Sequence, residues 1–127
     1  MRLPVALTAI ACLLGLAGVS HAGQIASPAI YGAFTQKKAQ CFIGNTGTSP
    51  IPVKVNILDE SGNVVPSGSS CGSAVEAGFI CSVFVNSIPN GVAFACSATT
   101  SGSASKLRGS LILYDANDIP LRSAALR

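Results

Sequence analysis

Apolar and polar residues alternate with a period of two along much of this chain, and this pattern constrains the fold more than any other feature of the sequence. Successive side chains of a β-strand point to opposite faces, so such alternation is typical of strands that bury one face. Val53, Val55 and Ile57, for example, fall on one face of the segment 52–59. The period of 3.6 residues that indicates an amphipathic helix is nearly absent, and we therefore predict an all-β protein.

Turn-forming residues divide the chain into seven or eight predicted strands. Ser61-Gly62-Asn63 and Pro89-Asn90-Gly91 have the composition of turns, because Gly and Asn tolerate positive φ. The predicted strands comprise residues 27–36, 38–45, 52–59, 64–65, 79–86, 91–100, 106–114 and 119–127, with 66–78 and 100–105 as loops. Short strands at such spacings are typical of a sandwich or a barrel.

Residues 1–22 have the features of a secretory signal peptide. A positive charge at Arg2 precedes an apolar run over 5–19, and small residues end the segment at Ala22. The run is about 15 residues long, whereas a membrane span needs roughly 20. We predict cleavage after Ala22, a single domain over 23–127 with no membrane span, and a secreted or periplasmic location.

Cys12 raises the alternative of a lipid-anchored protein, because a cysteine in this region can carry a lipid. Ala9 lies where a leucine is usual in such signals, and the apolar run continues past Cys12. The sequence therefore favours the cleaved signal peptide and leaves lipidation of Cys12 open.

Four cysteines remain after residue 22, namely Cys41, Cys71, Cys81 and Cys96. An even number in a small exported chain predicts two disulfides, although spacing alone leaves all three pairings open. No C-x-x-C is present, which argues against thiol exchange. A zinc site is disfavoured as well, because no histidine remains to complete it.

The predicted mature chain lacks the groups that most enzymes use. Its only histidine, His21, is removed with the signal, which excludes Ser-His-Asp and Cys-His catalysis. Four of the five acidic residues fall at predicted hairpin tips, where carboxylates usually form turns. A hydrolase using Asp59 or Glu60 is thus a remote alternative, and calcium binding by Asp115, Asn117 and Asp118 is disfavoured. We predict no catalytic, cofactor-binding or metal-binding residues.

Charge and aromatic residues narrow the binding classes. The sequence has eight Lys and Arg residues and five Asp and Glu residues. Removal of Arg2 with the signal leaves seven positive charges, so the mature net charge is near +2. Lys37-Lys38 is the one basic doublet. A nucleic-acid interface needs a basic stripe, so we expect no nucleic-acid partner. The five phenylalanines fall mostly at alternating positions that predict burial, which leaves sugar binding without support: Phe34, Phe42, Phe79, Phe84 and Phe94.

Two segments resemble strands of immunoglobulin-like sandwiches. "GVAFACSAT" is similar to the sixth strand, with Phe94 two residues before Cys96, and "KAQCFIGN" is similar to the second, which carries the partner cysteine Cys41. The chain has no tryptophan, and Phe94 replaces the usual tyrosine, so it departs from antibody-type domains. The resemblance is to immunoglobulin-like modules of exported bacterial proteins as a class.

The resemblance implies disulfides Cys41–Cys96 and Cys71–Cys81. Closing the longer of these two loops constrains the unfolded chain more than closing the shorter one. Pairing of Cys41 with Cys71 and of Cys81 with Cys96 stays open as the alternative.

We therefore expect a non-enzymatic exported protein that acts by surface contact, in the cell envelope or outside the cell. The segments 79–85 and 110–114 are apolar on both faces, which indicates either a buried central strand or a face that meets a partner. A protein partner is expected to bind through an edge strand or a loop. The alternative is a soluble ligand-binding or inhibitor module that uses the loops 66–78 and 100–105.

Overall fold

The computed structural model describes residues 23–127. The predicted signal peptide, its cleavage site and the question of Cys12 lie outside these residues.

The all-β prediction is confirmed, since residues 23–127 form ten strands and no helix. The strands are β1 (Gly23–Ala26), β2 (Lys38–Asn45), β3 (Ile51–Pro52), β4 (Lys54–Asp59), β5 (Gly68–Ser69), β6 (Ala74–Val75), β7 (Ile80–Val85), β8 (Phe94–Thr100), β9 (Leu107–Tyr114) and β10 (Pro120–Leu126). Three of them have only two residues each, so the seven longer strands agree with the seven or eight expected.

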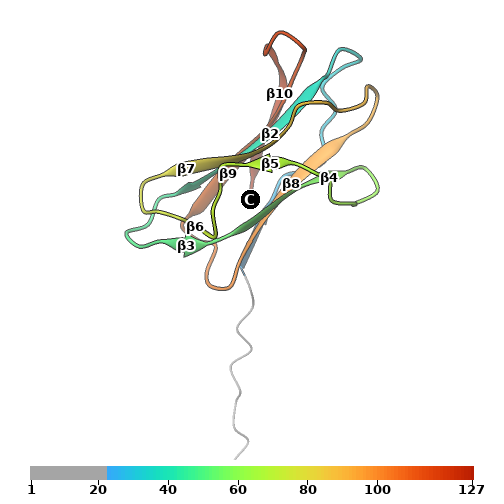
Figure 1. Ribbon diagram of the computed structural model, residues 1–127. Coiled ribbons are helices and arrows are strands. Elements are labelled where there is room, and N and C mark those ends of the chain that lie inside the picture. The colour runs from blue at the N-terminus through green and yellow to red at the C-terminus, as the bar shows by residue number, and fades with distance from the viewer. Residues whose placement is uncertain (1–22) are drawn as a thin grey trace, which may run out of the picture.

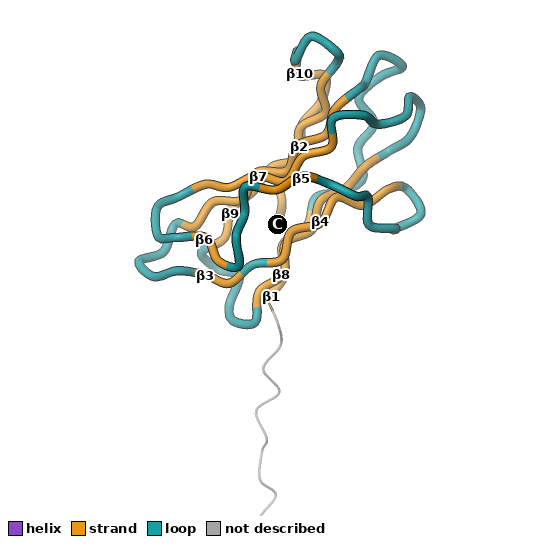
Figure 2. Tube along the Cα trace, viewed as in Figure 1, coloured by secondary structure: helices purple, strands orange, loops and turns teal. Residues whose placement is uncertain are grey.

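The strands form two main antiparallel sheets (Figures 1 and 2). One has five strands in the order β10-β9-β2-β7-β5, and the other has three in the order β1-β8-β4. The short pair β3 and β6 lies at the end where β2 finishes and β7 begins. The result is a two-layer β-sandwich whose core lies between the sheets.

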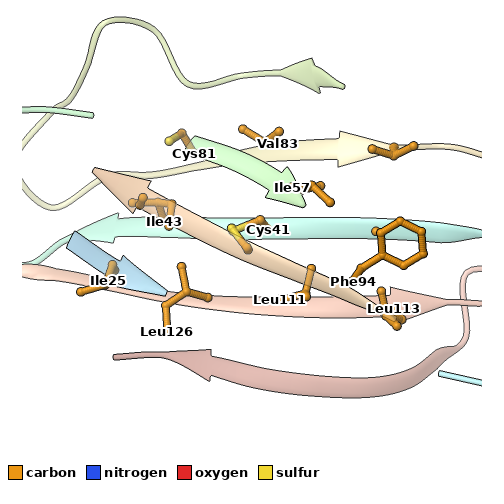
Figure 3. Close-up of a cluster of buried hydrophobic side chains, with 14 of the residues drawn as sticks. Ile25, Cys41, Ile43, Ile57, Cys81, Val83, Phe94, Leu111, Leu113 and Leu126 are labelled. Carbon is orange, nitrogen blue, oxygen red and sulfur yellow. A yellow bond between two sulfur atoms is a disulfide. The ribbon is translucent and has the colours of Figure 1, made fainter. Parts of the chain in front are cut away.

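The core consists of alternate residues from both sheets, as the period of two predicted (Figure 3). Cys41, Ile43, Leu111 and Leu113 from the five-stranded sheet and Ile57, Phe94, Cys96 and Ala98 from the three-stranded sheet are buried. Each buried aliphatic or aromatic side chain stabilises the folded state by about 1.5–3 kcal/mol. The face expected for the segment 52–59 is confirmed, since Ile57 is buried and Val53 and Val55 pack against the core.

Both disulfides have the predicted pairing. Cys41 of β2 is bonded to Cys96 of β8, with Cα atoms 6.2 Å apart, so this bond joins the two sheets. Cys71 is bonded to Cys81 of β7, with Cα atoms 4.9 Å apart, which ties the segment between β5 and β6 to β7. The alternative pairing is thereby excluded.

The strand order is consistent with an immunoglobulin-like sandwich in its centre and differs at its margins. In that class the sheets run A-B-E-D and C-F-G. Numbered along the chain, β2-β7-β5 corresponds to B-E-D and β4-β8 to C-F. However, β9 lies beside β2, where strand A is expected, and β1 lies beside β8, where strand G is expected. The strands that correspond to A and G are thus exchanged between the two sheets, and β10 adds a further strand outside β9.

The strand predicted over 27–36 is wrong. This segment makes one isolated bridge, from Ile30 to Phe94, and otherwise forms a loop. The cause is the fully buried side chain of Gln36, whose Nε2 donates to the carbonyls of Pro89 and Val92 at 2.8 and 2.7 Å. Its Oε1 accepts from the Gly32 amide at 2.9 Å. These bonds fold the segment across the end of the sandwich, and β1 precedes it as a strand that the pattern did not indicate.

The two disulfides differ in the length of chain they enclose, and this gives a stability prediction. Loop-closure entropy assigns about 4 kcal/mol to the bond that spans 55 residues and about 2.7 kcal/mol to the one that spans 10. We expect the double variant Cys41→Ala/Cys96→Ala to lose more unfolding free energy than Cys71→Ala/Cys81→Ala, because it also leaves a cavity in the core. Urea unfolding of both variants measures the difference, and equal or reversed losses would contradict it.

Candidate functional site

The carboxylates considered for hydrolysis serve a turn. Asp59 and Glu60 line a hollow at one end of the sandwich, together with Val64, Pro66 and Val92. Oδ1 of Asp59 accepts hydrogen bonds from the amides of Ser61 and Asn63, both at 2.9 Å, and so closes the hairpin. This is the turn-forming role that hairpin-tip acids commonly have.

The acids of the last hairpin are engaged in the same way. Oδ1 of Asp115 accepts from the amides of Asn117 and Ile119 at 2.8 and 3.0 Å. Asp118 forms an ion pair with Lys38, so one member of the basic doublet is bound within the chain. Burial raises the pKa of the Tyr114 phenol, and the nearby charge of Asp118 adds to this effect.

The buried polar side chains have structural partners. Nδ2 of Asn45 donates to the carbonyls of Ser49 and Val75, and its Oδ1 accepts from the Gly47 amide. Within residues 23–127, every buried side-chain nitrogen and oxygen has a hydrogen-bond partner, and no three His, Cys, Asp or Glu residues lie close enough to hold a metal. The buried polar groups therefore hold loops in place.

A second hollow lies on the outer face of the five-stranded sheet, and its floor is Gly44 of β2. The register places Gly44 between Ile80 of β7 and Arg108 of β9, and Phe42 precedes it on the same face. Phe79 and Gly78 complete one wall, and the hollow has a volume of about 460 Å³. We call this feature the Gly44 hollow.

Gly44 has no structural reason to be glycine. Its φ is not positive, and the nearest atom that an added Cβ would meet, Cγ1 of Ile80, is 3.4 Å away. By contrast, a Cβ on Gly109 would lie 2.7 Å from the carbonyl oxygen of Phe42. Glycine inside a strand costs about 0.5–1 kcal/mol, and it often marks a place where a ligand or another backbone approaches closely.

The walls of the Gly44 hollow are apolar and exposed. Phe79 is 66% exposed and Ile80 is 72% exposed. Gly78, with φ of 77°, turns the chain just before them, and its amide donates to the carbonyl of Asn45. Phe79 therefore lies ahead of β7 and not on its inward face, so its predicted burial is wrong.

The other phenylalanines also depart from the prediction of mostly buried positions. Only Phe94 is fully buried, whereas Phe42 and Phe84 are half-buried and Phe34 is 79% exposed. Phe34 lies in the loop over 27–36, where its ring packs edge-on against Tyr31. Phe84 is covered by Gly68 of β5, whose absent side chain leaves room for the ring. The outer face of β7 is thus covered at one end and open at Ile80.

The rim of the Gly44 hollow is cationic. Arg108 is exposed, and its guanidinium donates to the carbonyls of Ser105 and Leu107 at 2.8 and 2.7 Å. In the part of the chain that the structure describes, no carboxylate forms an ion pair with Arg108. Lys106 lies two residues before it, in the turn that precedes β9. The hollow thus combines an apolar floor and wall with positive charge at its rim.

Two edge strands, β10 and β4, are poorly placed to accept another strand. β10 begins with Pro120, has a register shift before Arg122, and carries that charge on the edge. Such features discourage edge pairing. The outer edge of β4 is already bonded to residues 63–65, since Val65 donates to Ile57 and Asp59 donates to Asn63.

The two predicted recognition loops differ in their relation to the hollow. The segment 66–78 contains the short strands β5 and β6, so its prediction as an irregular loop is wrong in part. It lies along β7, where Ser70 and Ser82 exchange hydrogen bonds, and its last residue, Gly78, lines the Gly44 hollow. The segment 100–105 does not contribute to the hollow.

Comparisons of the chain with protein-family models, with curated proteins and with solved structures found no match. None of the described residues forms a helix of the length and hydrophobicity that a membrane crossing requires.

The role of Asp59 in its turn can be tested by substitution. Asp59→Ala removes two charge-assisted acceptor bonds, so we expect a loss of about 1–2 kcal/mol in unfolding free energy. Asp59→Asn retains an acceptor oxygen and should lose less, and Glu60→Gln serves as the control that leaves stability unchanged. Thermal and urea unfolding would contradict this role if all three variants were as stable as the wild type.

Proposed function

We propose that this chain is an exported, non-enzymatic protein that acts by surface contact, and that it makes the contact through the Gly44 hollow. The observation that carries the proposal is Gly44 itself, a strand-interior glycine that neither the backbone nor the core requires. Its cost in stability is accounted for if another molecule must approach the sheet at this point.

The surroundings of Gly44 support the same conclusion. Phe79 and Ile80 expose apolar surface beside it, and exposed apolar surface that is rimmed by polar groups marks interaction sites. Arg108 adds positive charge, so the contact surface favours a partner that presents an apolar side chain next to a carboxylate.

The non-enzymatic part of the proposal rests on chemistry. Histidine is absent after residue 22, and all four cysteines of 23–127 are in disulfides. Asp59 and Asp115 accept backbone hydrogen bonds within their own turns. Export is supported by the disulfides, which form and persist in oxidising compartments, and by the predicted signal peptide.

Site-specific crosslinking tests the proposal directly. A photoreactive phenylalanine analogue is placed at Phe79 in the wall of the hollow, or at Ser123 on the same sheet face in β10 as a matched control, and the protein is irradiated in the cells that produce it. We expect discrete adducts from position 79, at least fivefold more abundant than those from position 123. Equal yields at both positions, or no adducts at position 79, would refute the proposal.

A further inference from the structure

The side-chain charges of the sandwich are separated between its two ends. One end of the sandwich is where β2 and β8 begin and where β4 and β9 finish. This acidic end carries Asp59, Glu60, Asp115, Asp118, Lys37, Lys38 and Arg122, a net charge of 3 − 4 = −1. The opposite, basic end carries Lys54, Lys106, Arg108, Arg127 and Glu76, a net charge of 4 − 1 = +3. The Gly44 hollow lies at the basic end.

The hairpin between β9 and β10 projects from the acidic end, where Figure 1 shows it at the top. Ile119 at its tip is 56% exposed and follows directly after Asp118. An exposed aliphatic side chain beside carboxylates is the chemistry that complements the Gly44 hollow with its cationic rim.

The hairpin tip is held in one conformation before it meets any partner. Asp115 accepts from the amides of Asn117 and Ile119 and donates its own amide to the carbonyl of Ile119. Asp118 has a φ of 61°, which aspartate tolerates, and its carboxylate is held by Lys38. A preorganised tip loses little conformational entropy on docking, which favours its use as a contact element.

We propose that the occupant of the Gly44 hollow is the β9–β10 hairpin tip of a second copy of this chain. Ile119 of one copy packs over Gly44 between Ile80 and Arg108 of the next, and the acidic residues beside Ile119 face the cationic rim. The inference rests on the proposed function, since it identifies the partner that uses the same hollow.

The geometry of this contact defines the assembly. The hairpin tip and the hollow lie at opposite ends of one molecule, so each copy that receives a tip still presents its own. Such a heterologous contact does not satisfy both surfaces within one pair, and it extends into a chain of copies unless the rotation closes a ring. A single hairpin buries little area, so the contact is weak and sensitive to salt.

Sedimentation velocity of residues 23–127, with both disulfides formed, tests the inference at low and high salt. We expect the average mass of the wild type to rise with protein concentration up to about 1 mM, because the contact is weak. In 1 M salt the assembly should dissociate. Gly44→Trp fills the hollow and Ile119→Ser removes the tip, so each alone should stay monomeric. Arg108→Glu repeats the test of the hollow by charge, and Ser123→Trp, on the same sheet face, should associate like the wild type.

Mixing the two defective variants distinguishes a head-to-tail contact from any other. Gly44→Trp retains a working tip and Ile119→Ser retains a working hollow, so their equimolar mixture should form a dimer that grows no further. A mixture that stays monomeric would overturn the inference. So would normal association of Ile119→Ser, which would show that the hollow pairs with another surface.

The outcome can be separated from that of the proposed function. A wild type that stays monomeric at 1 mM in low salt overturns self-association, while adducts of Phe79 with a different protein would leave the contact function in place. If the monomeric wild type instead binds vesicles that contain anionic phosphatidylglycerol and Gly44→Trp does not, the hollow docks on a lipid surface and the inference is wrong. Absence of any adduct at Phe79 defeats both proposals.

Discussion

The bond between Cys41 and Cys96 is the constraint on which the rest of the structure depends. It crosses the core and joins the middle strand of the larger sheet to the middle strand of the smaller one. Because side chains alternate along a strand, an inward Cys41 makes Ile43 inward and makes Phe42 and Gly44 outward. The bond that stabilises the core therefore also determines which residues of β2 lie on the outer face of the sheet.

The sequence predicts the interior of this protein better than its surface. Alternation and turn residues identified β2, β8 and β9, because burial of one face imposes a period of two. The alternation predicts burial of Phe79, but Gly78 turns the chain just before β7 and leaves Phe79 exposed. The loop over 27–36 depends on hydrogen bonds from Gln36 to residues more than 50 positions away, which no local pattern indicates. The Gly44 hollow is likewise visible only in three dimensions, since Ile80 and Arg108 become its neighbours through strand register.

A small core with two disulfides leaves room for a residue that weakens its strand. The two disulfides constrain the unfolded chain, so the protein tolerates the loss of about 0.5–1 kcal/mol in unfolding free energy at a strand glycine. The separation of charge between the ends of the sandwich acts at longer range, because it orients approaching molecules before they touch. In the proposed contact function, stability and recognition use opposite faces of the same sheet, with Cys41 on one and Gly44 on the other.

The central claim is that Gly44 is glycine for contact and not for folding, and the unfolding free energy of Gly44→Val tests it most directly. Valine suits a strand and meets no atom closer than 3.4 Å at its Cβ. The account predicts that this variant is as stable as the wild type or more stable by up to about 1 kcal/mol, and that crosslinking from position 79 is lost. A loss of stability of more than about 1 kcal/mol, or crosslinking that persists unchanged, would contradict it.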